Sequence, residues 1–314
     1  MRVTHGPYAA LRGAARSALT IGNFDGLHRG HQAMLARLKE AAGERGLAPC
    51  VLTFEPHPRE FFAPLSAPVR LTTMRTKLEL LEAAGVEHAH VERFDAQFAA
   101  LSPERFVADV VTGALGCEWL LVGRDFRYGA KRAGDFAALE ADAARFGFAL
   151  EPMPEVMHAG ERISSSAVRA ALGADDLDRT RDLLGRPYMI AGRVAHGDKL
   201  GRGLGFPTAN IPLGSERVPL HGIYVVEVAG IEGAKQWPGV ASVGVRPTVK
   251  AGAPPLLEVH LFEYSGELYG RHLQVSFLAK LREEEKYPGL DALRAAIAGD
   301  VAGGRAYFAA RKHG

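Results

Sequence analysis

His28 and His31 stand three residues apart in the segment 22–31, which reads G-N-F-D-G-L-H-R-G-H. The apolar run ending at Ile21 predicts a strand before this segment, and apolar residues at helical spacing from Met34 predict a helix after it. The two imidazoles then share one face of the first helical turn, where exposed N–H groups and the helix dipole attract phosphate. They can donate hydrogen bonds to negative charge that develops on a phosphoryl oxygen. This chemistry is typical of nucleotidyl transfer, in which an incoming phosphate attacks the α-phosphate of ATP and pyrophosphate leaves.

By itself, a His-x-x-His pair on a helix is more often a surface or metal-site pattern than a catalytic one. Three features of the surroundings favour catalysis here: the preceding strand, the glycine-rich turn from Gly22 to Gly26, and Gly30 between the histidines. Gly30 leaves room for a ligand at the helix start, where a larger side chain would block it. The segment therefore predicts a site for the phosphates of a nucleotide.

Three further segments of the first half carry residues suited to the same chemistry. Segment 54–58, F-E-P-H-P, is a rigid corner after a predicted strand, which by itself indicates a structural turn more often than a site. Segment 123–129, G-R-D-F-R-Y-G, has cations to clamp phosphate and aromatic rings to stack on a flat ring, although an ordinary charged loop is an equal alternative. Segment 163–169, I-S-S-S-A-V-R, is typical of a capped helix start, and simple capping is its default interpretation.

The segment 201–210, G-R-G-L-G-F-P-T-A-N, is the strongest signal in the second half. Its glycines permit a loop that surrounds phosphates with backbone N–H groups. The Thr208 hydroxyl can bind Mg²⁺, and Asn210 can hold a phosphate oxygen or a metal-bound water. No Gly-Lys-Ser/Thr follows, so the segment is not a Walker loop. Local composition alone favours an ordinary glycine- and proline-rich turn.

The order of the expected elements indicates two architectures in one chain. Strand-like runs alternate with helical stripes up to about residue 185, which predicts a doubly wound parallel sheet whose ligands bind beyond the carboxyl ends of its strands. A short helix over 175–184 follows, and then short strands and many turns predict a small antiparallel β-barrel, with a terminal helix from about Leu290. We therefore expect an α/β domain over residues 1–185 and a β domain over 186–314, each with its own core.

The composition restricts the class of protein. The 314 residues carry 38 basic and 36 acidic side chains, a net charge of +2 that gives no support for a nucleic-acid partner. Cys50 and Cys117 are the two cysteines, which excludes a disulfide scaffold and favours a reducing compartment. The N-terminus lacks an apolar signal core, and no apolar run is long enough to span a membrane. We therefore expect a cytoplasmic protein without a membrane partner, and the sequence specifies no oligomeric state.

Taken in order, these motifs resemble those of the prokaryotic bifunctional FAD synthetases, a family that combines riboflavin kinase and FMN adenylyltransferase in one chain. The resemblance covers about residues 17–308, and the second half adds the segments 221–224, 244–248, 257–261, 268–270 and 281–285. It implies that the second half phosphorylates riboflavin with ATP to give FMN, and that the first half adenylylates FMN with a second ATP to give FAD and pyrophosphate. It also implies Mg²⁺ as cofactor, and Glu258 as the general base that takes the proton of the riboflavin 5′-hydroxyl.

The motifs and this resemblance together give the expected site residues. The catalytic residues are His28, His31, Arg169 and Glu258. The nucleotide-binding residues are Gly22, Phe24, Asp25, Gly30, Asp125, Ser164, Ser165, Gly201, Gly205, Pro207 and Asn210. The flavin-binding residues are Pro56, His57, Pro58 and Phe126, and the metal ligands are Thr208 and Asn210.

Two positions depart from the family pattern. Ser166 stands where Thr is more frequent, which keeps the hydroxyl. Ser242 stands where Asn is common, and its hydroxyl replaces one hydrogen bond but not the donor and acceptor pair of the amide. We therefore expect the second change to affect substrate affinity in the kinase half without removing a base or a metal ligand.

Three alternatives differ from this interpretation. The chain could retain only one of the two activities, it could be a different adenylyltransferase such as one acting on phosphopantetheine, or it could be a non-catalytic flavin-binding regulator. The F-P-T-A-N segment argues against the second alternative, since such a barrel has no role there. The intact set of His28, His31, Thr208, Asn210 and Glu258 argues against the third, since a binding module needs no base.

Overall fold

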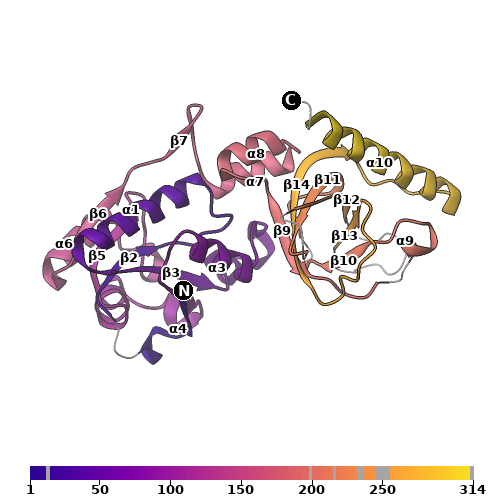
Figure 1. Ribbon diagram of the computed structural model, residues 1–314. Helices are drawn as coiled ribbons and strands as arrows, with labels where there is room; N and C mark the ends of the chain where they lie inside the picture. Colours follow the sequence, from indigo (N-terminus) through magenta and orange to yellow (C-terminus); the bar gives the residue numbers. More distant parts are fainter. Residues whose placement is uncertain (12–14, 198–199, 215–216, 232–235, 245–254, 312–314) are drawn as a thin grey trace. The chain divides into compact units, whose positions relative to one another are not determined.

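The computed structural model describes residues 1–11, 15–197, 200–214, 217–231, 236–244 and 255–311 (Figure 1). The chain folds into two compact units. The first unit comprises Met1–Pro68 and Thr72–Ser165, and the second comprises Val69–Leu71 and Ser166–Gly314. Residues 166–185 thus belong to the second unit, whereas the sequence analysis assigns them to the first domain.

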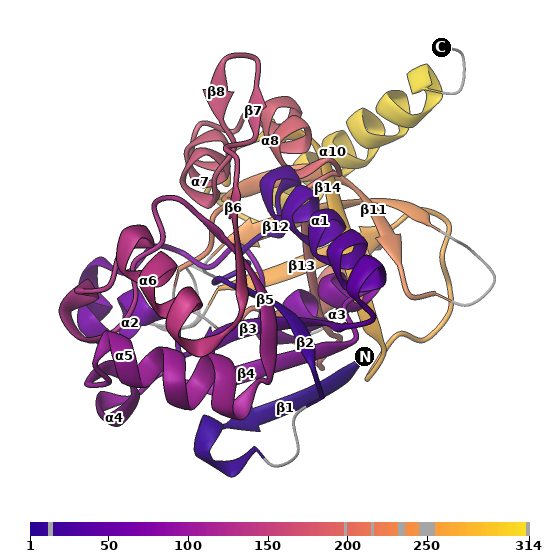
Figure 2. The ribbon, with the colours of Figure 1, turned by 90° about the vertical axis from the view of Figure 1, so that its left-hand side faces the viewer.

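A parallel sheet forms the centre of the first unit. Its strands within the described residues are β1 (Arg2–Gly6), β2 (Ser17–Ile21), β3 (Ala48–Glu55), β4 (His88–Arg93), β5 (Cys117–Gly123) and β6 (Ala149–Met153). They lie side by side in the order β1-β4-β3-β2-β5-β6, and each neighbouring pair is parallel (Figure 2). β2 is buried along its whole length, as expected for a strand that is covered on both faces.

Helices cover both faces of this sheet. They are α1 (Arg29–Arg45), α2 (Pro58–Phe62), α3 (Met74–Ala83), α4 (Ala96–Ala99), α5 (Pro103–Arg105) and α6 (Phe136–Phe146). Alternate strand residues face opposite sides: Leu19 and Leu52 pack with the π-helical segment Phe106–Ala114, whereas Ala18 and Val51 pack with α1 and α3. The doubly wound α/β architecture that the sequence predicts is confirmed.

The sequence does not predict β1, because R-V-T-H-G lacks an apolar run. Polar side chains hold this strand to β4: Thr4 Oγ1 lies 2.9 Å from both His88 Nε2 and His90 Nδ1. His90 Nε2 in turn lies 3.0 Å from a Glu92 carboxylate oxygen, which also accepts a hydrogen bond from Tyr8 N at 2.8 Å. Burial lowers the pKa of His88 to about 4, so this ring is neutral at pH 7.

The second unit contains a nearly closed antiparallel barrel. Its strands within the described residues are β9 (Met189–Arg193), β10 (Ala209–Pro212), β11 (Gly222–Ala229), β12 (Trp237–Gly244), β13 (Leu256–Leu261) and β14 (His272–Arg282). They pair antiparallel in the order β10-β13-β12-β11-β14-β9. The outer strands approach each other where Ala195 N donates to Asn210 O at 2.8 Å. The predicted barrel is therefore confirmed.

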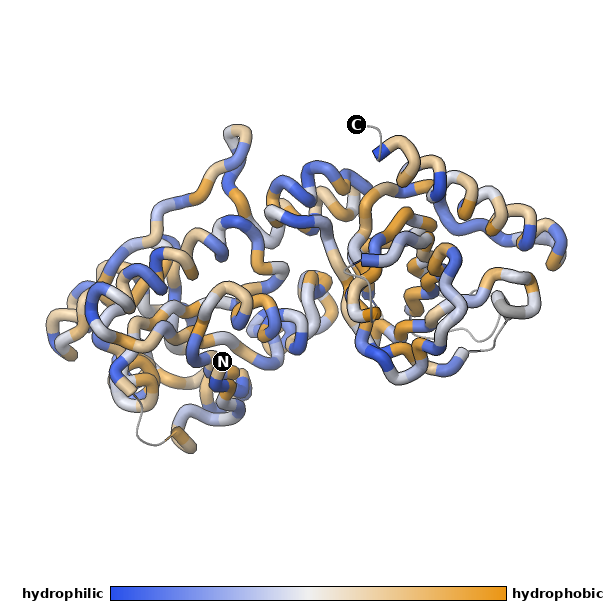
Figure 3. The backbone as a smooth tube through the Cα atoms, in the orientation of Figure 1, coloured by the Kyte–Doolittle hydropathy of each residue, from blue (hydrophilic) through white to orange (hydrophobic). Residues whose placement is uncertain are grey.

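Four described helices accompany this barrel: α7 (Ser165–Gly173), α8 (Leu177–Leu184), α9 (Leu200–Gly203) and α10 (Leu290–Arg311). Val301 of α10 packs against Val240 and Phe262 of the barrel. Hydrophobic residues gather in the barrel strands, whereas α10 alternates between hydrophobic and hydrophilic residues (Figure 3). The helix expected over 175–184 begins two residues later, because Asp175 has a φ of 57° and Asp176 caps the helix from outside.

Asp175 fastens the turn between α7 and α8 to the barrel. Tyr224 Oη of β11 donates to Asp175 Oδ1 at 3.2 Å, and Lys280 Nζ of β14 donates to Oδ2 at 2.6 Å. A second connection runs to the segment that precedes α3, since Tyr188 Oη donates to Leu71 O at 3.0 Å. These bonds explain why residues that precede the barrel in the sequence belong to the same unit.

Candidate active sites

The first candidate site surrounds the N-terminus of α1. His28 is the N-cap of this helix, and its Nδ1 accepts a hydrogen bond from His31 N at 3.3 Å. Because Nδ1 accepts, the ring proton of His28 is on Nε2, which is the donor nitrogen. The two rings are stacked with centroids 3.7 Å apart. Burial lowers the pKa of His31 well below its ordinary value, and repulsion from His28 and Lys77 acts in the same direction, so His31 is neutral at pH 7.

Asp25 and Ser165 hold the turn that precedes α1. One Asp25 carboxylate oxygen accepts hydrogen bonds from Thr72 N at 3.0 Å and from Thr72 Oγ1 at 3.1 Å. Ser165 Oγ donates to the Asp25 carbonyl at 2.8 Å. Gly30 has little room for a side chain, since a Cβ there would lie 3.1 Å from His28 Nδ1. The three residues therefore shape the turn, and their contacts with a nucleotide stay predictions.

Phe24 and Gly22 form the hydrophobic base of the same turn. Phe24 is fully buried, and its ring centroid lies 5.0 Å from that of His31. Its φ of 48° is in the left-handed region, which turns the chain toward the helix start. A Cβ at Gly22 would lie 3.2 Å from the Phe24 ring. Phe24 thus packs against His31, and Gly22 leaves space for the Phe24 ring, whereas a direct contact of either residue with nucleotide stays a prediction.

The segment 123–129 turns back after β5, and its side chains have partners within the first unit. Asp125 pairs with Arg162 at 2.7 Å. Arg162 lies on β8 (Glu161–Arg162), which forms a hairpin with β7 (Met157–His158). The Phe126 ring stacks on the Tyr128 ring, with centroids 5.7 Å apart, and packs against the core. Nucleotide binding by Asp125 and flavin binding by Phe126 stay predictions.

The segment 54–58 forms the corner that its prolines predict. Pro58 begins α2 and His57 caps it: His57 Nδ1 accepts from Arg59 N at 3.1 Å, and His57 N donates to a Glu60 carboxylate oxygen at 3.1 Å. The segment therefore forms the structural turn that the sequence favours for it. Flavin binding by Pro56, His57 and Pro58 stays a prediction.

Ser164 and Arg169 flank the start of α7. Ser164 immediately precedes the helix, so the helix start that I-S-S-S-A-V-R predicts is present. Arg169 belongs to the second unit, where its Nε donates to Val69 O at 2.6 Å. Anion binding by the two residues stays a prediction.

Lys77 is a candidate that the sequence analysis missed. This residue of α3 is only 6% exposed, and its Nζ lies 3.5 Å from Thr53 Oγ1. Its charge reaches His31, whose pKa it lowers. The signal in the sequence was a lysine within the apolar stripe that starts at Met74, where a buried charge needs a reason.

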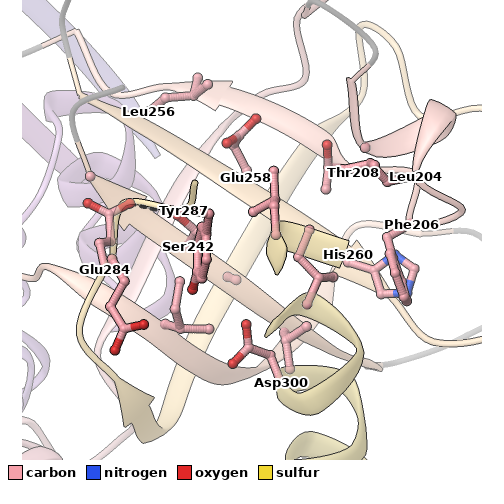
Figure 4. Close-up of a pocket in the computed structure, with 18 of the residues that line it drawn as sticks. Leu204, Phe206, Thr208, Ser242, Leu256, Glu258, His260, Glu284, Tyr287 and Asp300 are labelled. Atoms are coloured by element: carbon pink, nitrogen blue, oxygen red, sulfur yellow. Dashed lines mark hydrogen bonds between the residues drawn. The ribbon is translucent and has the colours of Figure 1, made fainter. Parts of the chain in front are cut away.

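The second candidate site is a cavity of about 620 Å³ in the barrel (Figure 4). Strand register sets a row of residues across it: Asn210 of β10 pairs with Glu258 of β13, and Glu258 pairs with Ser242 of β12. Ser242 pairs with Ile223 of β11, which pairs with Arg282 of β14. All five residues line the cavity. The barrel thus brings together residues from motifs that are far apart in the chain.

Glu284 and Ser242 form one wall of this cavity. Ser242 Oγ donates to a Glu284 carboxylate oxygen at 3.0 Å. Burial raises the pKa of Glu284, the Ser242 hydrogen bond opposes the rise, and the charge of Glu258 adds to it. A side chain at Gly244 would overlap the Glu284 carboxylate. The serine that replaces the usual asparagine therefore has a defined role, which is to bind Glu284.

Helix α10 and the segment before it form another part of the cavity lining. Arg282 Nε and Nη2 each donate to an Asp300 carboxylate oxygen at 2.7 Å, which fastens α10 to β14. The hydrophobic side chains on this wall are Tyr287, Leu290, Leu293 and Ile297. The cavity thus has a polar floor and an apolar wall.

The glycine-rich segment forms the short helix α9 followed by a turn into β10. Three predicted residues of this segment line the cavity, namely Gly201, Thr208 and Asn210. The predicted base, Glu258 of β13, lines it too. Gly205 has a φ of 89°, and the Pro207 carbonyl accepts from His260 Nδ1 at 2.9 Å. Asn210, the last residue of this segment, lies in β10, where it pairs with Glu258. Residues 245–248 of the family pattern lie outside the described residues.

Most of the side chains in this cavity that could act as ligands of a cation offer oxygen atoms. Thr208, Asn210 and Glu258 all line the cavity, Asn210 pairs with Glu258 between two strands, and the oxygens of these side chains suit Mg²⁺. Within the ranges that the structure describes, no group of three or more His, Cys, Asp or Glu side chains could hold a metal ion.

The same ranges contain no helix with the length and apolar character needed to cross a membrane.

The chain matches family models for both activities that the site geometry suggests. The model described as FAD synthetase matches residues 12–167, and the model described as riboflavin kinase matches residues 184–308. The bifunctional riboflavin kinase/FMN adenylyltransferase of Escherichia coli (strain K12) is 48% identical over 94% of this chain and 93% of its own length. The enzyme of the same description from Pseudomonas fluorescens is 49% identical over 94% of both chains.

A solved structure has the same architecture. It is described as a macrolide-efflux protein from Streptococcus pneumoniae, and it aligns with a TM-score of 0.80 and 26% identity. The alignment covers 96% of this chain and 97% of that one. The likeness therefore extends through both units rather than through one of them.

Proposed function

The chain belongs to the family of bifunctional riboflavin kinase/FMN adenylyltransferases, and on that premise we propose how its two sites divide the chemistry. The enzyme phosphorylates riboflavin with ATP to give FMN, and it adenylylates FMN with a second ATP to give FAD and pyrophosphate. We assign the first reaction to the barrel cavity and the second to the N-terminus of α1. The observation that carries this assignment is the row Asn210–Glu258–Ser242 in one cavity.

In the barrel, Glu258 is the general base. Its carboxylate accepts the proton of the riboflavin 5′-hydroxyl while that oxygen forms a bond to the γ-phosphorus of ATP and the bond to ADP breaks. Gly201 and Asn210 border the phosphates. The apolar wall formed with α10 suits the flat ring of the flavin, because aromatic rings gain from burial against apolar side chains.

Thr208 and Asn210 are the residues that would hold Mg²⁺ in this cavity. Both line it, and both offer neutral oxygen ligands next to the Glu258 carboxylate. Bound Mg²⁺ neutralises charge on the nucleotide phosphates. Thr208 and Asn210 also orient the phosphates toward the row of residues on the barrel floor.

At α1, His28 stabilises the charge of the transferring phosphate. The FMN phosphate oxygen attacks the α-phosphorus of ATP, and the bond to pyrophosphate breaks. His28 Nε2–H donates to an α-phosphoryl oxygen, and the neutral ring of His31 supports it by stacking. The buried Lys77 ammonium adds positive potential where this charge develops.

The full chain with riboflavin, ATP and Mg²⁺ tests both activities in one experiment. Chromatography of the products should show FMN followed by FAD. FMN without FAD would mean that the chain has only the kinase activity. FAD made only from supplied FMN would mean that it has only the adenylyltransferase activity. Bound flavin without any product would favour a non-catalytic flavin-binding protein.

We propose that residues 1–185 and 186–314 are separate modules, with the adenylyltransferase first. We therefore expect a chain that starts at Arg186 to phosphorylate riboflavin. It should melt at least about 4 °C below a chain that starts at Ser166, because it lacks the Asp175 contacts with Tyr224 and Lys280. Circular dichroism melts measure this difference, and Asp175→Asn in the longer chain tests the ion pair alone. An inactive Arg186 chain, with the full chain active, would contradict an independent kinase module.

We assign the enzyme to the cytoplasm. Cys50 and Cys117 are both buried free thiols, as in a reducing compartment. Burial raises the pKa of Cys50 to about 12, so this thiol stays protonated and unreactive at neutral pH.

A further inference from the structure

His260 lies in the barrel cavity and carries a hydrogen bond that none of the catalytic roles above uses. It follows Glu258 by two residues on β13, so both side chains lie on the same face of the strand. Both line the cavity, and Figure 4 shows His260 beside Phe206 at its edge. His260 Nδ1 lies 2.9 Å from the Pro207 carbonyl oxygen. A carbonyl only accepts, so Nδ1 carries the proton and donates it.

The Pro207 carbonyl lies at a point where the β-ladder stops. β10 begins at Ala209, which pairs with Val259, so the same register continued by one residue would bring Thr208 opposite His260. Pro207 has no N–H and cannot extend the ladder. Two described hydrogen bonds hold residues 206 and 207. Phe206 N donates to Gly201 O at 2.8 Å, and His260 Nδ1 donates to Pro207 O.

The His260 ring also contacts the residue before Pro207. Its centroid lies 5.5 Å from that of Phe206, at an interplanar angle of 84°. The side chain thus touches Phe206 by packing and Pro207 by a hydrogen bond. Thr208, whose hydroxyl lines the cavity, comes directly after these two anchored residues.

We propose that His260 is a positioning residue for the riboflavin kinase reaction. By donating from Nδ1 to the Pro207 carbonyl, it fixes the segment 206–208 so that the Thr208 hydroxyl faces the metal-bound phosphates of ATP. This inference rests on the proposed kinase function of the cavity. It predicts that loss of the donor weakens the binding of nucleotide with Mg²⁺ and leaves riboflavin binding unchanged.

A matched pair of substitutions isolates the donor. Asn at position 260 keeps an N–H close to the position of Nδ1, whereas Leu has nearly the shape of Asn and no donor. His260→Leu should raise the KM for ATP in FMN formation by up to about tenfold, the equivalent of one net hydrogen bond. His260→Asn should stay within about threefold of the parent, and neither change should alter the KM for riboflavin.

Calorimetric titration with ADP, with and without Mg²⁺, gives a readout that does not depend on turnover. The dissociation constant of ADP in the presence of Mg²⁺ should rise in His260→Leu by the same factor as the KM for ATP, and much less without the metal. Adenylylation of supplied FMN checks that each variant is folded. Equal behaviour of the Leu and Asn variants, or a loss confined to kcat, would overturn the proposal. A parent chain that makes no FMN yet binds ADP with the predicted differences would refute the kinase assignment and not the role of His260.

Discussion

Replacing Glu258 by Gln should lower FMN formation by about 10²-fold or more, the usual contribution of a general base. Gln keeps the shape of the side chain and its pairing position between Asn210 and Ser242, but it cannot take the proton of the riboflavin hydroxyl. Stopped-time assays of FMN formation measure the change. The affinity for ATP should change little, because Thr208 and Asn210, which we propose as the phosphate and metal ligands, are unchanged and line the same cavity.

Glu284 provides the matched control for this experiment. It is a second carboxylate on the same cavity, and burial raises its pKa. Glu284→Gln should cost much less in turnover than Glu258→Gln, because Glu284 is bound to Ser242 rather than placed in the central row. The reverse order of effects would make Glu284 the base. Adenylylation of supplied FMN should proceed at the parent rate in both variants.

Replacing His28 by Ala should slow FAD formation from FMN by more than about tenfold, the scale expected when one charge-stabilising donor is lost. The substitution removes the Nε2 donor and the ring that stacks on His31. FMN formation should persist, since it belongs to the barrel. Loss of both activities in a folded variant would contradict two independent sites.

His28→Asn separates catalysis from capping. Asn is a strong N-cap, and its side-chain oxygen can accept from His31 N as Nδ1 does, but it offers no donor at the position of Nε2. We expect this variant to melt like the parent and still to lose FAD formation. A parent-like rate would mean that His28 acts only as a helix cap.

The sequence predicted the elements whose signal is local. The strand, turn and helix around His28 follow from apolar spacing and glycine, and the barrel follows from regularly spaced short strands. β1 was missed because its partners, the ladder with β4 and the hydrogen bonds of Thr4 with His88 and His90, lie far along the chain. Such pairings leave no periodic pattern in a single segment.

The same distinction applies to the candidate sites. Asn210, Glu258 and Ser242 could be chosen one by one, but their row depends on a register between three strands that the sequence does not specify. His260 was not selected as a site residue, because its hydrogen bond to the Pro207 carbonyl joins two segments that are far apart in the chain. His57 caps α2, a role that the composition around a Pro-flanked histidine does not reveal, and its flavin binding stays a prediction.

The Asp175 contacts have a consequence for the inheritance of the two activities. The helix that begins with the serines of the adenylyltransferase motif runs into a turn that is built onto the barrel through Tyr224 and Lys280. A gene break between codons 165 and 173 would divide α7, and a break between codons 176 and 185 would remove from the barrel the Asp175 bonds to Tyr224 and Lys280. Recombination over most of this stretch is therefore expected to lower the stability of one of the two products, even where each module keeps its activity.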